Sequence, residues 1–250
     1  MKRLRITVVG AWCAILVFPT FLAGGILLSS GGASDLIPKT GKPGRAWLVA
    51  VASDSGFVAG GWILILMGYL AMVAFVGFYY ALRHAGQVLL LAPVLGVAGM
   101  VLVQISHLIP IGMAYELAPA YLARGADTAT LGSISDTFTA IALALNATGD
   151  ALVWGVTVPL YAWAVLTTRA MPRWIGWLGF VVAVFAGWLW PASVTLLLAP
   201  ASRVLESLSN IGFLAFFIFM PSMGIALLRR RPHTGKDQPA SAQDLAPTSP

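Results

Sequence analysis

The chain has little charge and almost no cysteine. Only 10% of its 250 residues are Asp, Glu, Lys or Arg, against about 25% in soluble proteins, and Cys13 is its single cysteine. A single cysteine excludes an intramolecular disulfide bond and a thiolate metal cluster. The low charge, together with 59% hydrophobic residues, excludes a soluble enzyme and a disordered chain. A nucleic-acid-binding module is also excluded, because no basic patch with interleaved aromatic residues occurs outside the apolar segments.

Histidine and the sequence motifs of catalysis are scarce as well. Of three histidines only His107 lies within an apolar segment, whereas a bis-histidine haem needs two such residues. The chain has no H-x-x-x-H or E-x-x-H pair that would indicate zinc, and no G-x-S-x-G elbow or phosphate-binding loop. We therefore expect neither a metal nor a cofactor.

Long apolar segments are what the chain does contain. Six segments have about 20 or more residues, the length that a helix needs to cross the hydrocarbon core of a bilayer, at 6–29, 56–82, 88–113, 136–167, 174–199 and 205–228. The sequence therefore predicts an all-α polytopic bundle of six transmembrane helices over residues 1–230. The first segment is too long for the apolar part of a signal peptide, so we interpret it as a retained span. The polar residues 231–250, rich in Pro, Ser and Ala, predict a disordered tail.

Basic residues next to the spans indicate the orientation of the bundle. If the N-terminus is inside, ten Lys and Arg residues lie on the cytoplasmic side and five on the outer side: Lys2, Arg3, Arg5, Arg83, Arg169, Arg173, Arg229, Arg230, Arg231 and Lys236 against Lys39, Lys42, Arg45, Arg124 and Arg203. Because cytoplasmic loops are enriched in Lys and Arg, this asymmetry predicts that both termini are cytoplasmic and that the chain lies in the cytoplasmic (inner) membrane. The outer connections, at 30–55 and 116–135, are predicted to be loops, and a short apolar piece at 47–52 is expected at the outer interface.

A few strongly polar residues fall inside the spans, where they are costly and indicate either a site or helix pairing. Asn146, Asp150 and Trp154 are spaced by four residues and therefore share one helix face, while Gln104 and His107 are spaced by three. Counting about 1.5 Å per residue from the cytoplasmic ends places these residues, and Asn210, in the outer half of the membrane. This arrangement predicts an outward-facing polar pocket centred on Asp150 and roofed by tryptophans: Trp154, Trp188 and Trp190.

Several interpretations of this polar cluster remain open. The side chains could only bridge helices, which contributes about 0.6 kcal/mol per hydrogen bond. They could bind a small or lipidic ligand or a partner helix, through the contact residues Gln104, Asn146, Trp154, Trp188 and Asn210. They could instead be catalytic, as in an isoprenoid cyclase in which Asp150, protonated in apolar surroundings, is the general acid, with His107 as a second catalytic residue. A proton-coupled transporter is the last alternative, although no charged residue continues the path toward the cytoplasm.

Three short motifs resemble those of a known family. They are Ser55-Gly56-Phe57 at the start of the second span, the segment MPRWIGWLG at 171–179, and three arginines after the last span, at 229–231. With the six spans and the long first outer loop, they resemble the bacterial integral membrane proteins classified as domain of unknown function 4386. The resemblance covers residues 1–230 and implies the fold and the topology, but it assigns no catalytic residue.

Overall fold

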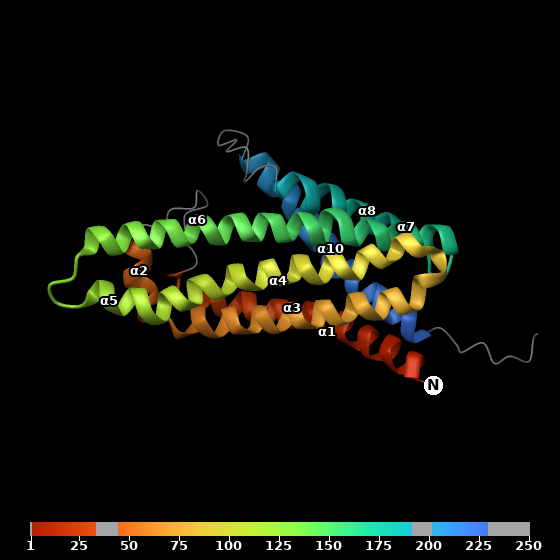
Figure 1. The fold of residues 1–250 in the computed structure, drawn as a ribbon, viewed down its shortest axis with the longest axis horizontal. Coiled ribbons are helices and arrows are strands. Elements are labelled where there is room, and N and C mark those ends of the chain that lie inside the picture. Colours follow the sequence, from red (N-terminus) through yellow and green to blue (C-terminus); the bar gives the residue numbers. More distant parts are fainter. Residues whose placement is uncertain (1, 34–44, 192–201, 230–250) are drawn as a thin grey trace, which may run out of the picture.

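The computed structural model describes residues 2–33, 45–191 and 202–229, and these residues are almost entirely helical. Figure 1 shows an elongated bundle whose long helices run along one axis. In chain order its α-helices are α1 (Lys2–Ser30), α2 (Arg45–Val51), α3 (Ser55–Leu82), α4 (Leu91–Gly112), α5 (Ala118–Leu122), α6 (Thr128–Leu152), α7 (Val158–Thr168), α8 (Arg173–Val182) and α10 (Ser202–Arg229). Short 3-10 turns η2 (Arg83–Ala85) and η3 (Gln87–Leu90) connect α3 to α4, and three π-helical segments lie within the bundle: η4 (Met113–Leu117), η5 (Val153–Thr157) and η6 (Ala183–Leu189).

Five helical segments are long and apolar enough to cross a membrane, namely Ile6–Ser30, Ser55–Ala85, Gln87–Leu122, Thr128–Thr168 and Asn210–Arg229. The prediction of an all-helical membrane protein is thereby confirmed. The predicted fifth span, 174–199, corresponds to a shorter apolar helix at Arg173–Leu189, and residues 192–199 lie outside the described residues. The count of six spans therefore stays a prediction, and the predicted tail at 231–250 also lies outside the described part of the chain.

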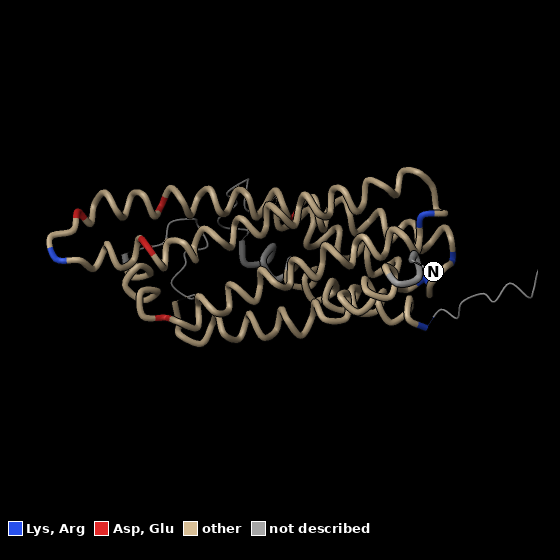
Figure 2. Tube along the Cα trace, turned by 60° about the horizontal axis from the view of Figure 1, so that its bottom comes forward, with Lys and Arg blue, Asp and Glu red and all other residues tan. Residues whose placement is uncertain are grey.

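Charges separate along the bundle axis (Figure 2). Lys and Arg gather at the end where α1 begins and α10 ends, which we call the basic end; it includes Arg83, Arg169, Arg173 and Arg229. Asp and Glu lie mainly toward the opposite, acidic end, where Arg124 is an exception at the tip. The start of the first helix and the end of the last helix thus share one end of the bundle.

The main core joins α3, α7 and α10 through large apolar side chains. Phe75, Phe78 and Tyr161 are fully buried, as are Phe216 and Phe219. The Tyr161 hydroxyl donates to the Phe75 carbonyl oxygen at 2.5 Å, so the only polar atom of this side chain is satisfied inside the core.

Close backbone contact takes the place of side-chain packing between α1 and α3. A Cβ atom on Gly77 would lie 2.7 Å from Gly10 Cα, a distance that no real side chain tolerates. Small residues at helix interfaces let backbones approach in this way within a membrane. The pairing of α1 with α3 therefore depends on glycine at both positions.

The acidic end holds a helical hairpin where the sequence predicted a loop. The prediction of a loop at 116–135 is wrong, because only residues 123–127 are non-helical. Asp127 caps α6 by accepting from the Thr130 backbone nitrogen at 3.1 Å and from its hydroxyl at 2.7 Å, and these donors lower the pKa of the Asp127 carboxyl group. The two arms, of 36 and 41 residues, are about 54 and 62 Å long, so they extend well beyond a hydrocarbon core of about 30 Å.

A second, smaller core supports the base of this hairpin. The apolar piece expected at 47–52 forms most of α2, and its residues Trp47, Leu48 and Val51 are buried against Phe57 and against the hairpin residues Met113, Ala114 and Ala118. Asp54 joins this core to two helices: its carboxylate accepts from the Phe57 nitrogen at 2.9 Å, capping α3, and from the Ala33 nitrogen at 3.3 Å, just after α1. The connection between α1 and α3 is therefore anchored at both ends.

Removal of the Asp54 carboxylate is expected to destabilise the acidic end. Asp54→Ala should lower the free energy of unfolding by about 1–2 kcal/mol, because it removes an N-cap and leaves the Ala33 nitrogen without this acceptor. Thermal unfolding in detergent measures the change. Asp127→Ala is the matched control, since Asp127 is an exposed N-cap without a second helix to hold. An equal loss in both variants would contradict the joining role of Asp54.

Candidate functional site

Asp150 is the centre of a buried hydrogen-bonded cluster at the end of α6. One carboxyl oxygen, Oδ2, accepts from Asn146 Nδ2 at 2.7 Å, and the other, Oδ1, accepts from Trp154 Nε1 at 2.7 Å. The donors come from one turn before and one turn after Asp150, so the structure brings together three residues that the sequence placed on one face. Trp190 also interacts with this carboxyl group. Asp150 is only 4% exposed, so its surroundings consist of these donors and the core.

Ser106 connects this cluster to α4. Its hydroxyl lies 3.1 Å from Asn146 Oδ1, to which it can donate, and 2.7 Å from the Val103 carbonyl oxygen. His107 Nδ1 lies 2.7 Å from the same carbonyl and 3.5 Å from the Ser106 hydroxyl, so His107 borders the cluster. Sequence reasoning missed Ser106. A usable signal was present, because serine within a span commonly forms a hydrogen bond to a neighbouring helix.

Three residues predicted for the pocket lie elsewhere. Gln104 is turned toward α3, where its Nε2 donates to the Ile65 carbonyl oxygen at 2.9 Å beside Gly68. Trp188 is 60% exposed and its indole donates to the Gly155 carbonyl oxygen at 3.1 Å. Asn210 is exposed on α10. The structure therefore gathers Asp150, Asn146 and Trp154, with His107 at the edge, and separates the others from them.

Proline explains the irregular backbone around the cluster. Each π-helical segment ends two residues before a proline: η4 before Pro119, η5 before Pro159 and η6 before Pro191. Proline has no N–H and its ring clashes with the carbonyl group four residues earlier, and a wider π turn relieves that clash. For Pro159 this carbonyl belongs to Gly155, and the Trp188 indole donates to it. Trp154 lies within η5, so this local widening sets the position of its indole beside Asp150.

An aromatic shell encloses the Asp150 cluster. The Trp154 ring packs edge-on against Phe216, with ring centroids 3.9 Å apart, and against Phe213 at 6.3 Å. Trp190 packs edge-on against Phe213 as well, at 6.2 Å. The grooves lined by residues of 51–62, 105–117 and 130–138 do not include Asp150. The carboxyl group is thus satisfied and covered, which suits a group that organises the bundle.

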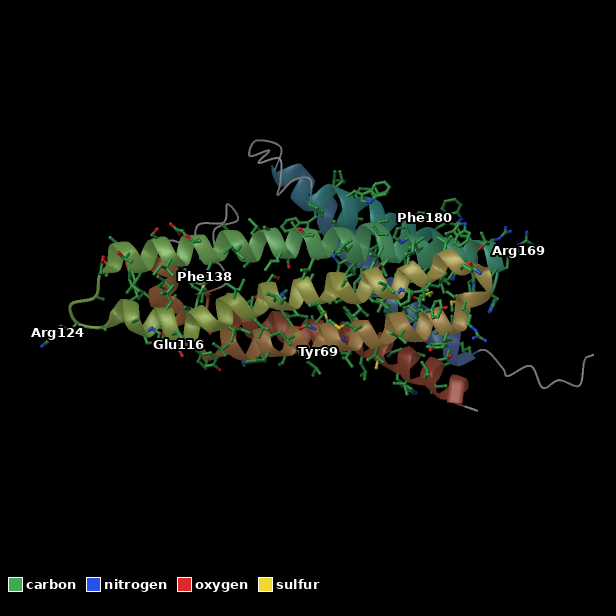
Figure 3. All side chains as sticks on the ribbon, in the orientation of Figure 1. Tyr69, Glu116, Arg124, Phe138, Arg169 and Phe180 are labelled. Carbon is green, nitrogen blue, oxygen red and sulfur yellow. The ribbon has the colours of Figure 1, made fainter. Side chains whose placement is uncertain are left out.

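An apolar groove lies beside the cluster, between α4–η4 and α6. Its volume is about 460 Å³, within the range of small-molecule sites. Seven of its eight lining residues carry no charge, and the eighth is Glu116, at the end of the groove nearest the tip of the hairpin. The lining residues are Ile105, Leu108, Ile109, Gly112, Met113, Glu116, Leu117 and Phe138. Figure 3 shows Glu116 and Phe138 in the half of the bundle toward the acidic end. Ile105 is adjacent in sequence to Ser106, so the inner end of the groove lies at the level of the polar cluster.

Comparisons with known proteins do not assign this site. The chain matches no family model, no curated protein and no solved structure. Among the residues that the structure describes, no group of three or more His, Cys, Asp or Glu is placed to hold a metal ion. The fold and the site thus define a helical membrane protein with a hydrogen-bonded cluster around one buried carboxyl group, beside an apolar groove.

Proposed function

We propose that the protein, placed in the cytoplasmic membrane with its basic end inside, binds a lipid-like molecule in the groove between α4–η4 and α6. The observation that carries this proposal is the groove itself: about 460 Å³, apolar along its length, with one carboxylate near its outer end. Its wall belongs to two helices that are long and apolar enough to span, and the part from Ile105 to Met113 falls within the predicted third span, so we expect lipid around this part of the groove. An apolar chain fits the part from Ile105 to Met113, and an amine-bearing headgroup fits beside Glu116.

The Asp150 cluster holds the two walls of this groove together. Ser106 on α4 and Asn146 on α6 bond across the interface, about one turn from the lining residue Ile109 and about two turns from Phe138. Asp150 fixes the Asn146 amide from within α6. Use of Asp150 as a general acid would require a substrate to reach its carboxyl group, whose two oxygens accept from Asn146 and Trp154. We therefore favour ligand binding over the enzyme and transporter alternatives.

Filling the groove is expected to reduce lipid retention severalfold. Gly112 lines the groove and a Cβ atom added there meets nothing within 4 Å, so the side chain of Gly112→Phe starts in open space at the groove. Native mass spectrometry of the detergent-purified protein, incubated with phosphatidylethanolamine, should show severalfold fewer bound lipids in this variant. Gly25→Phe, at an equally open position on α1, is the matched control, because it also replaces a helical glycine, and it should retain the lipid.

The headgroup is tested at Glu116. Glu116→Gln should remove the preference for phosphatidylethanolamine over phosphatidylglycerol, because the amide keeps the shape of the side chain and removes its charge. Equal retention of phosphatidylethanolamine by Gly112→Phe and the unmodified protein would overturn the groove as the binding site. An unchanged preference in Glu116→Gln would overturn the amine headgroup alone.

A further inference from the structure

We propose that the basic end of the bundle binds the phosphate of an anionic phospholipid through Arg83, Arg169 and Arg173. This site is separate from the groove, which lies toward the acidic end. Arg83 begins η2, which follows α3, while Arg169 is the C-cap of α7 and Arg173 begins α8. Because η2 contacts α7, the turn that carries Arg83 lies next to the turn that carries Arg169. All three side chains are exposed, and Figure 3 shows Arg169 projecting from this end.

The positive charge of these turns is unbalanced. Within the described ranges, Asp and Glu lie away from the basic end (Figure 2), and none of the three guanidinium groups has a carboxylate partner. Guanidinium groups at one level, with no carboxylate partner in the part of the chain that the structure describes, favour an anion that arrives from outside the chain. Arginine also presents a planar fork of donors that matches phosphate oxygens two at a time, which lysine does not.

Exposed tryptophans place the same turns at the level of lipid headgroups. Trp163, Trp174 and Trp177 are 39%, 54% and 64% exposed, on the last turns of α7 and the first turns of α8. Tryptophan concentrates at the membrane–water interface, where its ring lies among headgroups. Arginines beside this belt therefore face lipid phosphates, and basic sites between helices on the cytoplasmic side bind anionic headgroups.

The Arg169 backbone offers a way to separate binding from folding. Arg169 has φ 50 and ψ 24, the left-handed conformation, and its nitrogen donates to the Val165 carbonyl oxygen at 3.1 Å to close α7. Glycine or asparagine adopts this conformation at lower cost than arginine. Replacement of Arg169 by glycine therefore removes the charge while it relieves the backbone, so a loss of lipid binding in this variant does not come from a loss of folding.

The experiment compares the lipid-dependent thermal stability of the unmodified protein and of three variants, all purified in detergent. In the unmodified protein, cardiolipin and phosphatidylglycerol should each raise the melting temperature by several degrees more than phosphatidylethanolamine does, and inorganic phosphate should not raise it. The triple variant Arg83→Gln, Arg169→Gly, Arg173→Gln should lose most of this shift. Arg124→Gln, at the opposite end of the bundle, is the matched control and should keep it.

Each outcome decides part of the proposal. An unchanged shift in the triple variant would show that these arginines do not form the site, and an equal loss in Arg124→Gln would show a general charge effect. Equal stabilisation by inorganic phosphate would overturn the lipid as occupant. Gly112→Phe, which fills the groove, should keep the shift, so failure of the proposed function and failure of this inference are distinguishable.

Discussion

Asp150→Leu is expected to lower the free energy of unfolding by about 2 kcal/mol. The substitution leaves two donors, the half-buried Asn146 Nδ2 and the buried Trp154 Nε1, without their acceptor. An unsatisfied buried polar group costs about 1–3 kcal/mol. The lower end of this range, about 1 kcal/mol, applies to each of the two donors, because an unfolded chain in a membrane or micelle also provides hydrogen-bond partners for these groups. Equilibrium unfolding in mixed detergent micelles measures the difference.

Asp150→Asn is expected to cost much less, because the cluster can reverse its direction. If the Asn146 amide turns over, its oxygen accepts from the amide introduced at position 150 and its nitrogen donates to the Ser106 hydroxyl, which keeps Val103 as its own acceptor. Asn146→Leu blocks this rearrangement, so the double variant Asn146→Leu, Asp150→Asn should be less stable than the sum of the two single changes predicts. Strict additivity, or a stable Asp150→Leu variant, would contradict the structural role of the cluster.

Gly187→Ala is expected to cost about 3 kcal/mol and to separate the two π-helical segments beside the cluster. A Cβ atom on Gly187 would lie 2.5 Å from Gly155 Cα, and backbone cannot move aside as a flexible side chain can. The displacement would also pull the Trp188 indole away from the Gly155 carbonyl oxygen. Thermal unfolding and size-exclusion chromatography in detergent should show an earlier transition and a less uniform protein.

Gly25→Ala is the control for this substitution. A Cβ atom on Gly25 meets nothing within 4 Å, and alanine is the better helix former by up to about 1 kcal/mol, so this variant should be neutral or stabilised. If Gly187→Ala unfolds at the same temperature as Gly25→Ala, then η5 and η6 do not depend on the close approach of their backbones.

Part of the candidate site was predictable from helical spacing alone. Asn146, Asp150 and Trp154 share a face because residues four apart always do, and their hydrogen bonds are local to one helix. Spacing within a helix, however, does not determine which neighbouring helix that face contacts. Gln104 and Ser106 are two residues apart and point in different directions, one toward Ile65 on α3 and the other toward Asn146 on α6. Sequence reasoning named Gln104 and missed Ser106 for this reason.

The sequence by itself determined what depends on length, local chemistry and charge. Apolar segments longer than about 20 residues must form helices that satisfy their own backbone in lipid, and Lys and Arg separate from Asp and Glu toward opposite ends. Only the tertiary structure decided what depends on the contact between helices. It turned Trp188 outward and enclosed the Asp150 carboxyl group, because close backbone contacts such as Gly155 with Gly187 set the rotation of each helix against its neighbours. It also showed that helices continue through most of the predicted loop at 116–135.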